Sequence, residues 1–422
     1  MKNKKSKSWY KLDNAAKIFP PTTDKYDTKT FRFAVSLKEK IDSKILKEAL
    51  NVTLKDFPIF SSVLKKGFFW YYLEESDIEP EVTLESSPIC DYMDEGKLLF
   101  KVMYYKKRIT VEVSHALTDG TGTLLFLRSL TANYLEIKYE IKDTEILDTS
   151  STISKSDDSF SKYYKSSLNV DGKVKEKACH IKYNNYPENR IKVIEGLMPC
   201  KDVLKLAKSY NTTLTVYLTS ILIESIAMNM SINERKRPIY ITVPVNLRKY
   251  FPSETVRNFF NTISVSYKYK DGTKLKDIIE SIDKQFKSNL TKEELDKKMN
   301  GLALFENIFI IRLVPVFIKD IVLKISYMLS RRYHTMTFSN IGIVTMPEVF
   351  DKYIDYFDVF ASTDGMQACM CSYKDSLMVS FTSHFINTEI EKNFFRTLTS
   401  NDIKVTINAN IVEEDDIDEE ML

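Results

Sequence analysis

The sequence predicts a mixed α/β fold divided into two lobes. A chain of 422 residues is longer than one ordinary hydrophobic core requires, and 43% of its residues are apolar, which is enough for two cores. Strand patterns alternate with helical patterns along both halves of the chain. The segment 143–177 is instead rich in Ser, Asp and Lys, as is typical of a connection between domains. We expect an N-terminal lobe at 1–145, a linker at 146–178, a C-terminal lobe at 179–410 and an acidic tail at 411–422.

Alternating apolar residues indicate the elements of the N-terminal lobe. We expect helices at 43–54 and 124–134, and strands at 31–35, 69–73, 98–105 and 108–115. In the last strand, the apolar face consists of Ile109, Val111 and Val113, and Thr110, Glu112 and Ser114 form the other face. His115 continues the apolar face, so its imidazole is expected to point inward.

The C-terminal lobe is predicted in the same way. It opens with a strand at 191–194 and a helix at 201–210, and Asn211-Thr-Thr then provides a capping signal for an almost wholly apolar helix that ends at Met230. A helix of this kind must be buried. Further strands are expected at 239–245, 258–267, 335–344 and 376–381, and Cys369 and Cys371 are expected on one face of another.

The most apolar region lies at 302–329. Charged residues interrupt it, so no uncharged run approaches the roughly 20 residues that span a bilayer. At about 100° per residue these charges fall in one sector and leave a wide apolar face, and Pro315 should bend the helix. We favour packing of this helix on its own domain. The alternative is an interfacial helix that rests on lipid or guides a hydrophobic substrate.

The segment His115-Ala-Leu-Thr-Asp119-Gly120 is the strongest candidate for chemistry. A partly shielded histidine at a strand end, close to its neutral form at pH 7, suits a general base. Asp119 can hold the ring or the loop, Gly120 and Gly122 can supply positive φ angles, and Thr121 or Thr123 can cap the next helix. Taken alone, the pattern also fits a hydrogen-bonded core histidine followed by an Asp-Gly turn.

Composition excludes several other functions. The formal net charge is only +3 and the charges are scattered, so nucleic acid is not expected as a partner. Glycine is scarce, at 10 residues, and no phosphate-binding or dinucleotide-binding motif is present. The five cysteines lack zinc-site spacing, and the N-terminus lacks a signal peptide, so we expect a cytoplasmic protein without a metal. The basic run from Lys2 to Lys7 and the acidic run from Glu413 to Glu420 are expected to be solvated tails.

Further motifs resemble the coenzyme A-dependent acyltransferase superfamily, which includes chloramphenicol acetyltransferase, alcohol acetyltransferases and nonribosomal-peptide condensation domains. Besides the His115 segment, Pro244-Val-Asn-Leu-Arg248 and Asn258-Phe-Phe-Asn261-Thr262 occur in the family's order. Phe338-Ser339-Asn340-Ile-Gly342 looks like a segment of the alcohol acetyltransferase and wax-ester branches. The opening from Leu12 to Pro20 is similar to bacterial alcohol acetyltransferase-like proteins, so the resemblance covers nearly the whole chain.

This resemblance implies two similar chloramphenicol acetyltransferase-like lobes with an active-site tunnel between them. His115 would be the general base, and Asp119 would pair with Arg248 from the second lobe. The resemblance places Asn261 beside the site as structural support. The oxyanion would be stabilised by donors among Gly120, Ser339 and Asn340. Acyl-CoA is implied as a co-substrate, with an alcohol or other hydroxyl as acceptor and no bound cofactor.

Departures from the family pattern narrow the activity. Ser114 stands where condensation domains have a first histidine, and Asn258 stands where glycine is usual. The leading hypothesis is therefore a monomeric, free-standing acyl-CoA:alcohol O-acyltransferase that forms esters. The alternatives are a wax-ester or lipid acyltransferase with peripheral membrane contact through 302–329, a free-standing condensation-type enzyme that forms amides, and a catalytically silent binding module.

Overall fold

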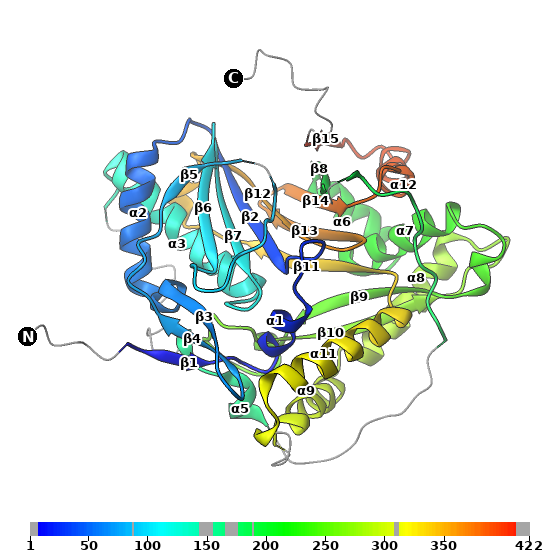
Figure 1. Cartoon of the computed structure of the whole chain (residues 1–422). Coiled ribbons are helices and arrows are strands. Elements are labelled where there is room, and N and C mark those ends of the chain that lie inside the picture. The colour runs from blue at the N-terminus through cyan, green and yellow to red at the C-terminus, as the bar shows by residue number, and fades with distance from the viewer. Residues whose placement is uncertain are drawn as a thin grey trace, which may run out of the picture.

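The computed structural model describes residues 7–86, 88–142, 155–164, 176–187, 190–307 and 312–410 (Figure 1). Most of the linker predicted at 146–178, most of the basic run and the acidic tail lie outside the described residues. The helices are α1 (Phe19–Thr22), α2 (Ser43–Asp56), α3 (Gly120–Tyr139), α5 (Ser159–Tyr163), α6 (Cys200–Ser209), α7 (Leu214–Met228), α8 (Leu275–Asn289), α9 (Lys292–Asn307), α11 (Val316–Ser330) and α12 (Glu389–Thr399).

The strands form three sheets. In chain order they are β1 (Trp9–Lys11), β2 (Thr30–Leu37), β3 (Ser62–Lys66), β4 (Tyr71–Glu75), β5 (Val82–Leu84), β6 (Phe100–Tyr105), β7 (Arg108–Ser114), β8 (Lys192–Pro199), β9 (Ile239–Asn246), β10 (Phe260–Tyr267), β11 (Met336–Val344), β12 (Ile354–Ala361), β13 (Met366–Tyr373), β14 (Ser376–Ser383) and β15 (Thr406–Ala409). The orders are β12-β2-β7-β6-β5, β10-β9-β11-β13-β14-β8-β15 and β1-β4-β3. The predicted mixed α/β class and the two-lobed arrangement are confirmed.

The five-stranded sheet organises the N-terminal lobe. Antiparallel strands β2 and β6 flank β7, and helices α2 and α3 pack together against this sheet. Asp42 caps α2 by accepting the backbone N–H of Lys44 at 2.9 Å. The strand expected at 69–73 begins later, at Tyr71, because a turn closed by Gly67 N–H donating to Trp70 O occupies the intervening residues.

The seven-stranded sheet organises the C-terminal lobe, with α7 buried against it (Figure 1). The predicted capping signal is confirmed, since Thr213 Oγ1 accepts the N–H of Val216 at 3.3 Å. Cys369 and Cys371 lie on β13 in the buried core, as predicted. β9 and β11 are parallel neighbours in this sheet. Arg248, which follows β9, and Ile341 of β11 both contact the start of α3 in the N-terminal lobe.

One strand crosses from the second half of the chain to the first sheet. Residues 354–361, assigned from the sequence to the C-terminal lobe, form β12 and pair with β2, with Phe357 opposite Val35. The boundary at 146–178 therefore does not separate the two sheets. Strand patterns could not show this because alternation reports a buried face and not the partner strand.

The helix expected at 302–329 is not continuous over the described part of this range. α9 ends at Asn307 and α11 begins at Val316, with Pro315 at its N-cap position, so proline starts a helix here instead of bending one. α11 packs on α1 and on the turn between β3 and β4, but through its charged side, and its apolar sector faces outward. Within the described ranges, no helix combines the length and hydropathy that crossing a bilayer would need.

Candidate active site around His115

Strand β7 places His115 at the inner end of the N-terminal sheet. Ile109, Val111 and Val113 are buried as predicted, and the His115 N–H donates to Lys29 O on the neighbouring segment at 2.9 Å. The other face of the strand is buried as well, since Glu112 accepts from Arg32 at 2.6 Å. Both faces of β7 are therefore fixed by packing, and the position of His115 is set by a rigid strand.

Three aromatic rings surround the imidazole of His115. Phe19 of α1 stacks on it, with ring centroids 4.8 Å apart and planes inclined by 21°. Phe31 of β2 lies at 4.3 Å and Phe260 of β10 at 6.0 Å, both tilted. These rings come from both lobes and give the imidazole a largely apolar environment.

That environment determines the charge of the imidazole. Burial lowers the pKa of His115 to about 4, although the Asp119 carboxylate opposes the shift. A histidine with this pKa is neutral at pH 7 and can accept a proton. Its Nδ1 is buried without a hydrogen-bond partner among the described residues.

Asn258 ties the His115 backbone to the second lobe. Its Nδ2 donates to His115 O at 3.0 Å, and its Nδ2 and backbone N–H both donate to Asp13 Oδ2 at 3.3 Å. Arg257 Nη2 lies 3.8 Å from the same Asp13 oxygen. Burial raises the pKa of Asp13 to about 6, which the Arg257 charge opposes.

Asp119 begins α3 and joins it to the second lobe. Its Oδ1 accepts the Gly122 N–H at 3.0 Å, so Asp119 is the N-cap of the helix. Its Oδ2 accepts the Phe259 N–H at 2.8 Å and Arg248 Nη1 at 2.8 Å. The Asp119–Arg248 pair implied by the family resemblance is thus present, and both side chains are buried or nearly so.

Arg248 is held by several backbone oxygens besides this carboxylate. Its Nε donates to Thr255 O at 3.0 Å, and its Nη2 donates to Arg257 O at 2.6 Å. These contacts order the connection between β9 and β10. The position of Arg248 therefore fits a structural role, in which a charge-assisted bidentate pair fixes the two lobes relative to each other.

Three local expectations about the start of α3 are wrong. The helix begins at Gly120, and neither Thr121 nor Thr123 caps it. Gly120 and Gly122 are helical, so they do not supply positive φ angles. Gly122 is required for another reason, since a Cβ there would lie 1.9 Å from Val256 O. The absence of a side chain lets α3 approach the second lobe closely.

The expected oxyanion donors are arranged unequally. The Gly120 N–H lies in the first turn of α3, where backbone N–H groups have no intrahelical acceptor. Asn340 Nδ2 donates to Thr215 Oγ1 at 2.8 Å, and its Oδ1 accepts the Gly342 N–H at 2.8 Å, so this side chain supports the β11 bulge. Ser339 precedes it on β11, partly buried.

Asn261 and the other histidines occupy separate positions. Asn261 is buried on β10, and its Oδ1 accepts the N–H of Thr262 at 2.7 Å. His384 is buried with its two ring nitrogens near the backbone oxygens of Arg190 and Tyr26, at 3.1 and 3.0 Å. His334 Nδ1 lies 2.9 Å from a threonine hydroxyl. Neither of these histidines has the partly open, aromatic surroundings of His115.

Sequence reasoning missed several residues of the site. Phe19, Phe31 and Phe260 surround His115, and Asp13 anchors Asn258. The only signal was the departure of Asn258 from the glycine usual in the family. Aromatic residues at scattered positions carry no pattern that reveals their convergence on one ring.

Known proteins match the chain only at the level of fold. No family profile and no curated protein matches it. Polyketide synthase associated protein 5 from Mycobacterium tuberculosis matches with a TM-score of 0.62 at 12% identity, over 92% of this chain and 96% of that one. Trichothecene 15-O-acetyltransferase from Fusarium sporotrichioides matches with a TM-score of 0.61 at 10% identity, over 95% and 97%.

A mutant starter condensation domain of rhizomide synthetase, solved in complex with C8-CoA, also matches. Its TM-score is 0.62 at 10% identity, and the alignment covers 93% of this chain and 94% of that one. Identities this low support a statement about architecture alone. The chain has the two-lobed fold of condensation domains and CoA-dependent acyltransferases.

Proposed function

We propose that the protein is an acyl-CoA-dependent O-acyltransferase in which His115 is the general base. The observation that carries this proposal is the imidazole of His115 at the end of β7, enclosed by aromatic rings from both lobes. The Asp119–Arg248 pair holds the lobes around it. The fold supports the same reaction class, because solved neighbours with this fold include an acetyltransferase and a domain bound to C8-CoA.

The proposed reaction needs one proton acceptor that later becomes a donor. His115 removes the proton of an acceptor hydroxyl while its oxygen attacks the thioester carbonyl carbon. The resulting oxyanion is stabilised by the Gly120 N–H at the start of α3, with Ser339 as a second donor. When the carbon–sulfur bond breaks, the imidazolium returns its proton to the departing thiolate. The products are an ester and free CoA.

The test is acceptor-dependent release of free thiol from acetyl-CoA and longer acyl-CoA donors, with a panel of alcohols. We expect His115→Ala to lower the rate by about 10²–10⁴-fold, the usual contribution of a general base. His180→Ala is the matched control, since His180 lines a different pocket together with Ile226 and Met230. Wild-type turnover in folded His115→Ala would remove the assignment, and release with amine acceptors alone would favour the condensation-type alternative.

A lipid or wax-ester acyltransferase is the second candidate. The specific observation in its favour is the outward apolar face of α11, which lies against α1 and so close to the elements that enclose His115. Long-chain alcohols in the same panel distinguish this candidate, because a short-alcohol enzyme should not prefer them.

A further inference from the structure

Helix α11 presents its apolar side to the outside of the molecule. Residues on one sector of the helix, which we call the α11 outer face, are each between 42% and 61% exposed. They are Phe317, Ile318, Ile321, Val322, Ile325, Met328 and Leu329. An ordinary surface helix turns such a stripe toward the core. Contiguous exposed apolar surface of this kind marks an interaction site.

The charged side of α11 faces the protein instead. Lys319 is 8% exposed, donates to Phe69 O at 2.9 Å, and lies 3.4 Å from the centroid of the Trp70 ring. Asp320 accepts from Lys66 Nζ at 3.0 Å and from Tyr71 OH at 2.9 Å. Lys319 and Asp320 thus both have partners on the rest of the protein, and these contacts fix which side of α11 faces inward.

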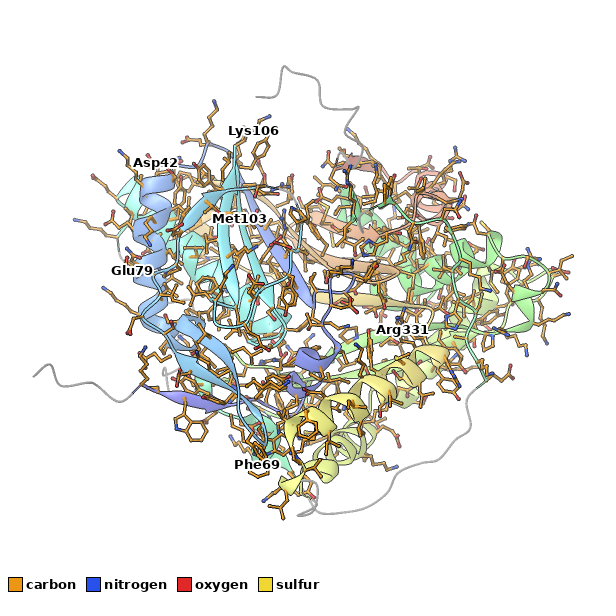
Figure 2. All side chains as sticks on the ribbon, viewed as in Figure 1. Asp42, Phe69, Glu79, Met103, Lys106 and Arg331 are labelled. Atoms are coloured by element: carbon orange, nitrogen blue, oxygen red, sulfur yellow. The ribbon has the colours of Figure 1, made fainter. Side chains whose placement is uncertain are left out.

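The turn between β3 and β4 extends the apolar surface. Phe68 and Phe69 are 69% and 39% exposed at this turn, and Phe68 O accepts the Val316 N–H at 2.8 Å. Figure 2 shows Phe69 and Arg331 at opposite ends of α11. The α11 outer face and the turn therefore form one surface along the edge of the molecule.

The exposed charges along this surface are all cationic. Over residues 312–333 they are Arg312, Lys324, Arg331 and Arg332. At about 100° per residue, Lys324 borders the α11 outer face, and the two arginines follow its last turn. Arg331 pairs with Asp364 at 2.6 Å but stays half exposed. The cations therefore border the apolar surface. In an anionic bilayer, apolar side chains of such a surface enter the acyl region and the bordering cations meet the headgroups.

We propose that the α11 outer face and the Phe68–Phe69 turn bind the surface of an anionic membrane. The helix would lie in the plane of the interface, with its apolar side chains among the acyl chains and its cations among the headgroups. A lipid surface fits better than a second copy of the chain. A two-fold contact through this face would bring Lys324 and Arg332 of one copy near those of the other, and residues 312–333 carry no exposed acidic side chain to offset them.

The inner side of α11 connects this surface to the candidate active site. Tyr327 OH accepts from Lys29 Nζ at 2.8 Å, and Lys29 O accepts the His115 N–H. The same helix packs on α1, whose Phe19 stacks on the His115 ring. In a step that rests on the proposed function, membrane contact would bring a lipid-soluble hydroxyl acceptor to His115.

Sedimentation of the full chain with vesicles tests the proposal. We expect binding to mixed phosphatidylcholine–phosphatidylserine vesicles and weaker binding to pure phosphatidylcholine. Ile321→Glu/Ile325→Glu should lower the partition coefficient by about 100-fold, because each isoleucine that moves from water into the acyl region strengthens binding by more than a factor of ten. Lys324→Glu/Arg332→Glu should lower binding to the anionic vesicles by about fivefold per charge.

The matched control is Leu84→Glu/Ile407→Glu, which alters two exposed apolar residues of similar accessibility on β5 and β15, far from α11 (Figure 1). It should bind as the wild type does, and circular dichroism should show all variants folded. Wild-type protein that stays in the supernatant, or unchanged binding of Ile321→Glu/Ile325→Glu, would overturn the proposal. A dimer that this variant dissociates would also overturn it. Vesicle binding requires no turnover, so it fails or succeeds independently of thiol release.

Discussion

At the scale of single residues, the surroundings of His115 determine its chemistry. Phe19 and Phe31 shield the ring from water, and this loss of solvation disfavours the charged form of the imidazole. The Asp119 carboxylate recovers part of that loss and burial outweighs it, so the pKa of His115 falls to about 4. The imidazole is a weak base that is fully available at neutral pH.

The pH dependence of acyl transfer follows from this shift. A base works in its neutral form, which exists above its pKa, so the single-turnover rate should stay level from pH 8 to about pH 5 and fall with a midpoint near 4. Stopped-flow thiol detection, with circular dichroism at each pH, measures it. A midpoint near 6.5, the ordinary histidine value, would show that the ring is solvated during turnover.

Asn258 is predicted to position His115. Asn258→Ala removes the hydrogen bond to His115 O and should lower kcat by about tenfold, with little change in KM for acyl-CoA. Asn258 raises the pKa of His115, so the acidic limb of the pH profile should move to lower pH in this variant. Asn229→Ala removes a comparable amide-to-backbone bond on α7 and should leave kcat unchanged. Equal effects in both variants would contradict a positioning role.

At the scale of elements, the start of α3 connects the two lobes. Asp119 satisfies an N–H of its own helix, the Phe259 N–H and the Arg248 guanidinium. Gly122 lets the same turn approach Val256. One capped helix end therefore sets the distance between the strand that carries His115 and the β9–β10 connection.

Removal of one partner of this pair should be costly. Asp119→Ala or Arg248→Ala leaves a buried charge uncompensated, so each should destabilise the fold by about 3–5 kcal/mol and lower activity. Denaturant unfolding of the single and double variants measures the coupling. The exposed pair Lys97–Asp94 is the control, and its removal should leave Tm unchanged. Additive effects at Asp119 and Arg248 would show that the pair is not a coupled unit.

At the scale of the whole molecule, the two halves of the chain share one sheet. Strand β12 comes from the second half and covers the outer edge of β2, an edge that would otherwise expose unpaired backbone groups. The short helix α5 adds to this connection, since its Phe160 packs edge-on against Phe259. Neither half is complete as an independent folding unit.

This sharing predicts how a cut chain behaves. A protease site introduced within 165–175 and then cleaved should leave the two fragments together in gel filtration, because β12 and the Asp119–Arg248 pair still join them. The fragment 1–164 expressed alone should aggregate through its open β2 edge. The uncut protein that carries the same protease site is the control for the effect of the inserted residues. Separation of the fragments in native buffer would contradict the shared sheet.

The sequence by itself determined the local features of this protein. These features are the strand that leads to His115, the Thr213 cap of α7 and the mixed α/β class. Each depends on residues close together in the chain, so side-chain periodicity and capping chemistry predict it. The family resemblance added the pairing of Asp119 with Arg248. These predictions succeeded because the interactions involved either join residues close together in the chain or belong to a motif that the sequence shows.

Only the tertiary structure decided which surfaces meet. Alternation could not assign β12 to the first sheet, and the amphipathic pattern of α11 could not show which side faces outward. The same holds for Asn258, whose amide reaches His115 O from the second lobe. The physical reason is that partner choice depends on contacts between residues far apart in the chain, which leave no periodic signal in the sequence.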